Sequence, residues 1–196
     1  ALGRFEEAMT AYQQALEINP DLFEARNNLG TVEMERGRAA DAIHSFRNAI
    51  GLNPGFAEAH YNLGNAARKQ GHGQEAVAYY RRALNIDPNL AEAHNNLGEA
   101  LLDRNDPEGA IEHYLLALKC RPGMARTLNN LGNAYRELGM VEESVRCYRT
   151  ALDLKPDHAH AYNNLGNSLK DKGLVKEAIH CYMTASRLMP SFAAAH

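Results

Sequence analysis

Apolar residues recur along the whole chain at the three- and four-residue spacing of amphipathic helices, and the stretches with this spacing come in pairs. A residue suited to the left-handed conformation that ends a helix separates the members of each pair. These residues are Gly37, Gly71, Asn105, Gly139 and Gly173. A proline, which stops a helix, follows the second stretch at Pro54, Pro88, Pro122, Pro156 and Pro190. The pattern predicts an all-α chain of two-helix hairpins.

The hairpins are copies of one unit. The string Asn-Leu-Gly recurs at a constant step of 34 residues. The step predicts five full repeats, preceded by a half repeat and followed by the start of another: 1–22, 23–56, 57–90, 91–124, 125–158, 159–192 and 193–196. One hairpin is too small to bury its own apolar face, so neighbours must stack. We therefore expect a single array, a fragment of a longer one.

The unit resembles the tetratricopeptide repeat (TPR). Its Leu-Gly, alanine, aromatic, alanine and proline positions are filled in each repeat, with Ser144 in place of one alanine. The resemblance covers the whole chain and implies a right-handed superhelical solenoid. In that family, the polar side of the first helix of each hairpin lines a concave groove.

The sixth position of the repeat carries an asparagine throughout. We call this row the asparagine ladder: Asn28, Asn62, Asn96, Asn130 and Asn164. A side-chain amide offers a donor and an acceptor, which a peptide backbone needs for a bidentate contact. A regular row would hold an extended chain through its main-chain groups. The alternative is that these amides only cap or bridge adjacent hairpins.

Neighbouring polar positions extend the candidate site. The ninth position adds Asn65, Asn133 and Asn167, and the fifth adds Asn27, Asn95, Asn129 and Asn163. Tyr61 interrupts the fifth-position row and would stack on a ligand side chain. The second position carries Glu24, Glu58 and Glu92, and then Arg126 and His160.

The unbroken Asn-Leu-Gly repeats, and residues 161–170 in particular, are similar to the superhelical repeat domain of O-linked N-acetylglucosamine transferases. The resemblance implies that the ladder contacts the backbone of protein substrates and that Glu24, Glu58 and Glu92 select substrate residues. It also implies a catalytic domain, outside this fragment, that uses UDP-N-acetylglucosamine. Similar arrays occur without a transferase, so the alternative is a non-enzymatic scaffold for complex assembly, with self-association as a further option.

Composition narrows the partners to proteins or extended peptides. With 21 Lys and Arg against 24 Asp and Glu, the chain lacks the basic excess expected for binding nucleic acid or anionic membranes. No apolar run approaches the roughly 20 residues that span a bilayer. Three cysteines, an odd number, argue against a disulfide framework. We expect a cytoplasmic protein, with the nucleus as an alternative.

We expect no catalytic residue, metal site or cofactor in this fragment. None of the nine histidines has the spacing of a zinc-binding helix motif. The sequence from Gly71 to Ala76 matches a dinucleotide-binding fingerprint, but it lies in the turn of a helical hairpin instead of after a strand. RNA recognition by a helical-repeat code fits poorly, because such arrays carry more positive charge.

Overall fold

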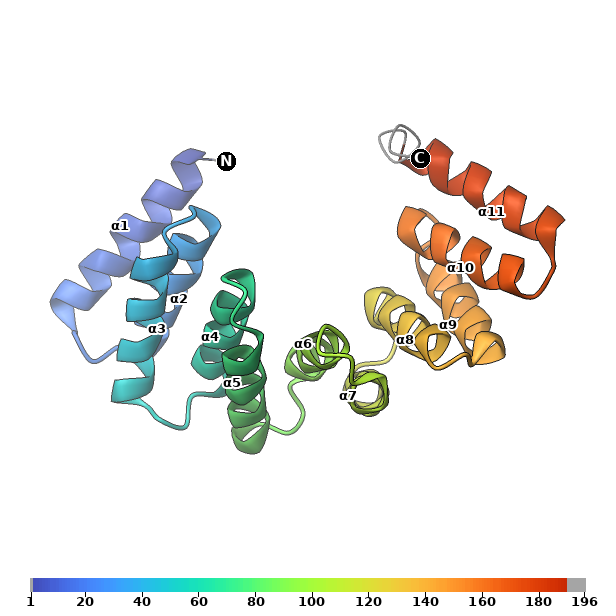
Figure 1. Cartoon of the computed structure of the whole chain (residues 1–196). Coiled ribbons are helices and arrows are strands. Elements are labelled where there is room, and N and C mark those ends of the chain that lie inside the picture. Colours follow the sequence, from blue (N-terminus) through green and yellow to red (C-terminus); the bar gives the residue numbers. More distant parts are fainter. Residues whose placement is uncertain (1, 190–196) are drawn as a thin grey trace. The chain divides into compact units, whose positions relative to one another are not determined.

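The computed structural model describes residues 2–189, and side chains from residue 5 onward. This part of the chain folds into eleven α-helices and contains no β-strand (Figure 1). The helices are α1 (Leu2–Ile18), α2 (Phe23–Glu35), α3 (Ala39–Leu52), α4 (Ala57–Lys69), α5 (Gly73–Ile86), α6 (Ala91–Leu102), α7 (Pro107–Cys120), α8 (Ala125–Glu137), α9 (Val141–Leu154), α10 (Ala159–Asp171) and α11 (Val175–Leu188). The predicted all-α class is confirmed.

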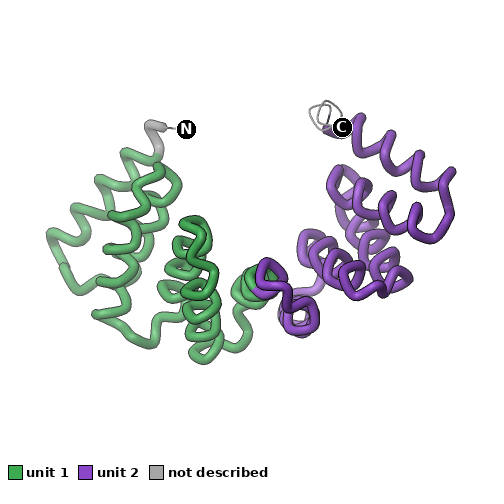
Figure 2. Tube along the Cα trace, viewed as in Figure 1, with its two compact units in different colours: residues 1–100 green, residues 101–196 purple. Residues whose placement is uncertain are grey.

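The chain divides into two compact units, residues 1–100 and residues 101–196 (Figure 2). In the first unit, α2 packs on α3 and α4 packs on α5, while α3 packs against α4. The second unit repeats this arrangement, with α8 on α9, α10 on α11, and α9 against α10. Each unit is therefore a stack of hairpins in which a second helix also contacts the first helix of the next hairpin.

The turn inside each hairpin follows from its left-handed residue. Gly37 has φ of 77°, and Asn105 takes the same region with φ of 61°. After α2, the Arg38 N–H donates to the Glu33 carbonyl at 2.9 Å and the Gly37 N–H donates to the Met34 carbonyl at 3.1 Å. These two bonds are the Schellman motif, which satisfies the last carbonyls of a helix.

The Leu-Gly signature marks a close approach between the two helices of a hairpin. A Cβ atom on Gly64 would lie 2.5 Å from Cε1 of Tyr80, and one on Gly132 would lie 2.5 Å from Cε1 of Tyr148. Both tyrosines are completely buried. Only glycine leaves room for the ring, and the tyrosine hydroxyl thereby reaches past the first helix toward its polar side.

Small buried residues let neighbouring hairpins approach one another. Ala42 and Ala66 are both fully buried in the first unit. In the second unit the equivalent pair is Ser144 and Ser168, equally buried, whose hydroxyl oxygens lie 2.9 Å apart. Apolar side chains of α9 and α10, including Val145 and Leu165, complete this core. A serine pair thus replaces an alanine pair at a boundary between hairpins.

Two further properties bear on function. All three cysteines are free, as expected. No helix within residues 2–189 is long and apolar enough to cross a membrane.

Candidate functional site

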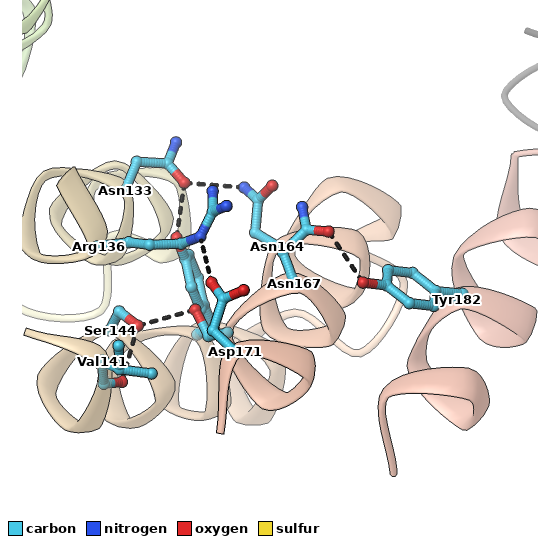
Figure 3. Close-up of polar contacts among 10 residues, drawn as sticks. Asn133, Arg136, Val141, Ser144, Asn164, Asn167, Asp171 and Tyr182 are labelled. Atoms are coloured by element: carbon cyan, nitrogen blue, oxygen red, sulfur yellow. Dashed lines mark hydrogen bonds and ion pairs between the residues drawn. The ribbon is translucent and has the colours of Figure 1, made fainter. Parts of the chain in front are cut away.

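The asparagine ladder takes part in hydrogen bonds between consecutive first helices. In the first unit, Asn62 Nδ2 donates to Asn27 Oδ1 at 2.9 Å. In the second unit, Asn164 Nδ2 donates to Asn129 Oδ1 and to Asn133 Oδ1, each at 3.0 Å (Figure 3). The donor ends of these ladder amides are therefore used inside the protein.

Asn96 repeats this arrangement in the first unit. Its Nδ2 donates to Asn65 Oδ1 at 2.8 Å and to the Tyr61 hydroxyl at 3.2 Å. Its Oδ1 accepts a bond from Asn95 Nδ2 at 3.0 Å. The bridging role that the sequence left open thus accounts for the donor ends of Asn62, Asn96 and Asn164.

The asparagines at the ninth position have the opposite orientation. Asn65 Oδ1 accepts from the Tyr80 hydroxyl at 2.9 Å, Asn133 Oδ1 from the Tyr148 hydroxyl at 2.8 Å, and Asn167 Oδ1 from the Tyr182 hydroxyl at 2.9 Å. The oxygens of Asn65 and Asn133 also accept the ladder bonds, so both lone pairs of each are used.

The nitrogens of the ninth-position amides stay available. In the part of the chain that the structure describes, Nδ2 of Asn65, Asn133 and Asn167 has no hydrogen-bond partner. Figure 3 shows Nδ2 of Asn133 and Asn167 pointing away from the bonds that their oxygens make. These three side chains are half-buried. Each therefore presents an oriented donor on the polar side of its helix.

The remaining predicted site residues differ in accessibility. Glu24 and Glu58 are exposed, whereas Glu92, Asn28 and Asn130 are half-buried. Tyr61 is half-buried and its ring centroid lies 6.0 Å from that of Tyr80.

The fifth-position row is not an open surface along its whole length. Asn27, at the fifth position, is fully buried and donates to Glu58 Oε1 at 3.4 Å. Including it in the open polar side was wrong, because α2 carries it into the contact with α4.

Ion pairs flank the amides. Arg68 Nη1 lies 2.7 Å from Glu99 Oε2, and Arg136 Nε lies 3.3 Å from Asp171 Oδ2. Burial raises the pKa of Tyr80 to about 12 and raises that of Tyr148 as well. Both hydroxyls therefore stay protonated near neutral pH, and they donate to the asparagine oxygens under those conditions.

The sequence did not reveal the role of these tyrosines. They occupy the aromatic position of the repeat, which indicates packing. A signal was nevertheless present: the repeat with Phe46 in place of tyrosine has Thr31 in place of the ninth-position asparagine. Within residues 2–189, no group of three or more His, Cys, Asp or Glu side chains is placed to hold a metal ion.

Solved structures of several repeat proteins are similar to this chain. MamA of Desulfovibrio magneticus RS-1 is 23% identical with a TM-score of 0.77, over 86% of this chain and 96% of that one. YrrB, described as a TPR protein with an unusual peptide-binding site, is 20% identical with a TM-score of 0.75, over 92% and 93%. A chain of the Cut9–Hcn1 hetero-tetramer of the APC/C is 21% identical with a TM-score of 0.84, over 96% and 38%. At these identities the likeness shows the shared fold.

Among curated proteins, no sequence matches the chain significantly. Family models for the tetratricopeptide repeat do match it, over residues 27–91, 67–131 and 159–192, and over 1–32 together with 132–173. These matches follow one another along the array from residue 1 to residue 192. The chain belongs to the tetratricopeptide repeat family.

Proposed function

We propose that this chain is a protein-binding scaffold that holds an extended polypeptide along the polar side of its first helices. One observation carries the proposal: the ninth-position amides are fixed by their oxygens and present their nitrogens outward. Asn65 supplies such a group in the first unit, and Asn133 and Asn167 supply two in the second.

The arrangement suits a peptide backbone. An extended segment outside a sheet has unpaired carbonyls along its length. An amide held by a protein hydrogen bond loses little further conformational freedom when it binds, so more of the interaction energy appears as affinity. Contacts to main-chain groups are largely independent of ligand sequence. We therefore expect broad selectivity from the amides, with further selection by exposed charges such as Glu24 and Glu58.

Two of the similar proteins support the proposal. YrrB is described as having a peptide-binding site, and the Cut9–Hcn1 structure is a protein complex. A stack of TPR hairpins is compatible with binding either an extended peptide or a folded partner. The exposed amide donors favour the extended peptide.

The test uses a fluorescent peptide of alternating serine and valine, about ten residues long, which spans roughly 33 Å when extended. We refer to it as the probe. Binding is followed by fluorescence anisotropy for the wild-type chain and for the double variant Asn133→Ala, Asn167→Ala. Each lost hydrogen bond contributes about 0.5 to 1.5 kcal/mol, so we expect the variant to bind roughly fivefold to a hundredfold more weakly.

The matched control is Arg146→Ala on α9, whose side chain is 74% exposed and pairs only with Glu143 at 3.1 Å among the contacts described. We expect this variant to bind the probe like the wild type. Equal affinities for the double variant and the wild type, with unchanged circular dichroism, would reject the amide face as the binding surface.

A second candidate is the substrate-recognition region of a protein O-linked N-acetylglucosamine transferase. The asparagine at the sixth position of all five repeats favours it, through the resemblance described above. Sequencing the parent transcript beyond His196 tests it. A following nucleotide-sugar domain would support the candidate, and its absence would leave the non-enzymatic scaffold.

A further inference from the structure

We infer that the peptide-binding element of this chain is a pair of asparagines from consecutive hairpins, aligned by a buried tyrosine hydroxyl. This inference rests on the proposed function and specifies it. The pair consists of the ninth-position asparagine of one repeat and the sixth-position asparagine of the next. We call it the amide clamp; its clearest example is Asn133 with Asn164.

The hydrogen-bond inventory of these two amides leads to the pair. Asn133 Oδ1 accepts from Tyr148 and from Asn164, so it has no lone pair left. Both hydrogens of Asn164 Nδ2 are used, one toward Asn129 and one toward Asn133. What remains is the Nδ2 donor of Asn133 and the Oδ1 acceptor of Asn164, which has no partner in the described part of the chain.

A single ladder asparagine therefore cannot make the bidentate contact expected from the sequence, because its donors are occupied. The two linked amides supply the same chemistry together. Asn133 Nδ2 would donate to a peptide carbonyl, and Asn164 Oδ1 would accept from a peptide N–H. The 3.0 Å bond between them holds donor and acceptor in one fixed relation (Figure 3).

The first unit contains a second amide clamp. Asn65 Oδ1 accepts from Tyr80 at 2.9 Å and from Asn96 at 2.8 Å. Asn96 Oδ1 accepts one bond from Asn95, which leaves its second lone pair for a ligand. The recurrence in a separate unit shows that the arrangement follows from the repeat.

The tyrosine acts as a positioning residue. A protonated hydroxyl at 2.8 Å from Asn133 requires an acceptor, so it keeps Oδ1 of that amide inward and Nδ2 outward. Without the hydroxyl, the amide can rotate and present its oxygen to the ligand. Tyr148 thus determines that this junction offers a donor.

The first repeat is a natural comparison. It has Phe46 at the aromatic position and Thr31 at the ninth, and the Thr31 hydroxyl donates to its own helix at the Asn27 carbonyl, 3.1 Å away. Asn62 consequently bonds only to Asn27 there, among the contacts described. We expect no clamp at this junction, and the chain would grip a peptide at selected junctions only.

The experiment measures binding of the probe to the full chain and to three variants: Tyr148→Phe, Asn133→Ala and the double variant. Phenylalanine keeps the ring that packs on Gly132 and removes only the hydroxyl. We expect Tyr148→Phe to weaken binding about threefold to tenfold. If the tyrosine acts through Asn133, the double variant binds no more weakly than Asn133→Ala alone. Additive losses would indicate a merely structural role and would overturn the inference.

Two controls separate this inference from the proposed function. Phe46→Tyr adds a hydroxyl where the clamp asparagine is missing, so it should leave affinity unchanged. A probe with N-methylated backbone amides lacks the donors that Asn164 Oδ1 would accept, so it should bind the wild type more weakly. If the wild type does not bind the unmodified probe, both proposals fail. If Asn133→Ala weakens binding and Tyr148→Phe does not, the tyrosine's role fails and the proposed function stands.

Discussion

The buried serine pair between α9 and α10 allows a quantitative test of how neighbouring hairpins recognise each other. The Ser144 hydroxyl donates to the Val141 carbonyl at 2.8 Å, so the Ser168 hydroxyl must be the donor in the 2.9 Å contact between the two side chains. Neither serine is accessible to solvent. Replacing one serine by alanine is therefore not equivalent to replacing the other.

The two single variants should differ in free energy of unfolding. Ser144→Ala removes the acceptor of the Ser168 hydroxyl and leaves a buried donor unsatisfied, which costs about 1 to 3 kcal/mol. Ser168→Ala leaves Ser144 bonded to the Val141 carbonyl, so only one hydrogen bond is lost, at about 0.5 to 1.5 kcal/mol. The double variant recreates the alanine pair that Ala42 and Ala66 form in the first unit, so its loss should be smaller than that of Ser144→Ala alone.

Urea unfolding followed by circular dichroism and tyrosine fluorescence gives these free energies, since the chain has no tryptophan. Hydrogen exchange in α9 and α10 locates the effect, because repeat arrays can unfold in parts. We expect a coupling energy of at least about 1 kcal/mol between the two serines. A double variant whose loss equals the sum of the single losses would refute the reasoning, since it would mean that the hydroxyls do not interact.

Three further predictions concern stability and reactivity. Gly132→Ala places a Cβ 2.5 Å from the Tyr148 ring and should lower the free energy of unfolding by about 1 to 3 kcal/mol, whereas Gly51→Ala, with open space at that position, should not. Burial raises the pKa of Glu33 above its ordinary 4.5, so folding favours the protonated carboxyl, and stability should fall as pH rises from about 4.5 through the folded pKa. Glu33→Gln should therefore stabilise the chain at neutral pH and flatten that pH dependence in urea titrations, and a steeper dependence would contradict this. Burial raises the pKa of Cys147 to about 11, so alkylation of this thiol at neutral pH, measured by mass spectrometry, should be much slower in the folded than in the urea-unfolded chain.

Much of the fold could be predicted from sequence because it depends on local backbone chemistry. The left-handed turn at Asn105 is an example: asparagine tolerates positive φ, and the observed φ is 61°. Asp106 likewise caps the next helix by accepting from the Gly109 N–H at 3.0 Å, ahead of Pro107 at the first helical position. Such features need only the residue and its neighbours along the chain.

The candidate site was less predictable, because it depends on which end of each amide the neighbouring repeat occupies. A repeat pattern places Asn133 and Asn164 on the same side of successive helices, but it does not say which lone pairs are used. Likewise, helical geometry placed Asn27 on the polar side, and only the contact with α4 shows that it is buried. The amide orientation required the positions of Tyr148 and of the next first helix together.

The central claim is that an extended polypeptide binds to the outward amide nitrogens of the first helices. Heteronuclear NMR of the side-chain amides, recorded while the probe is titrated, tests it directly. We predict that the Nδ2 signals of Asn65, Asn133 and Asn167 shift together, while those of Asn48 and Asn85 on the second helices stay in place. Shifts confined to Asn48 and Asn85, with the first-helix amides unchanged, would contradict the claim and place the binding surface on the second helices.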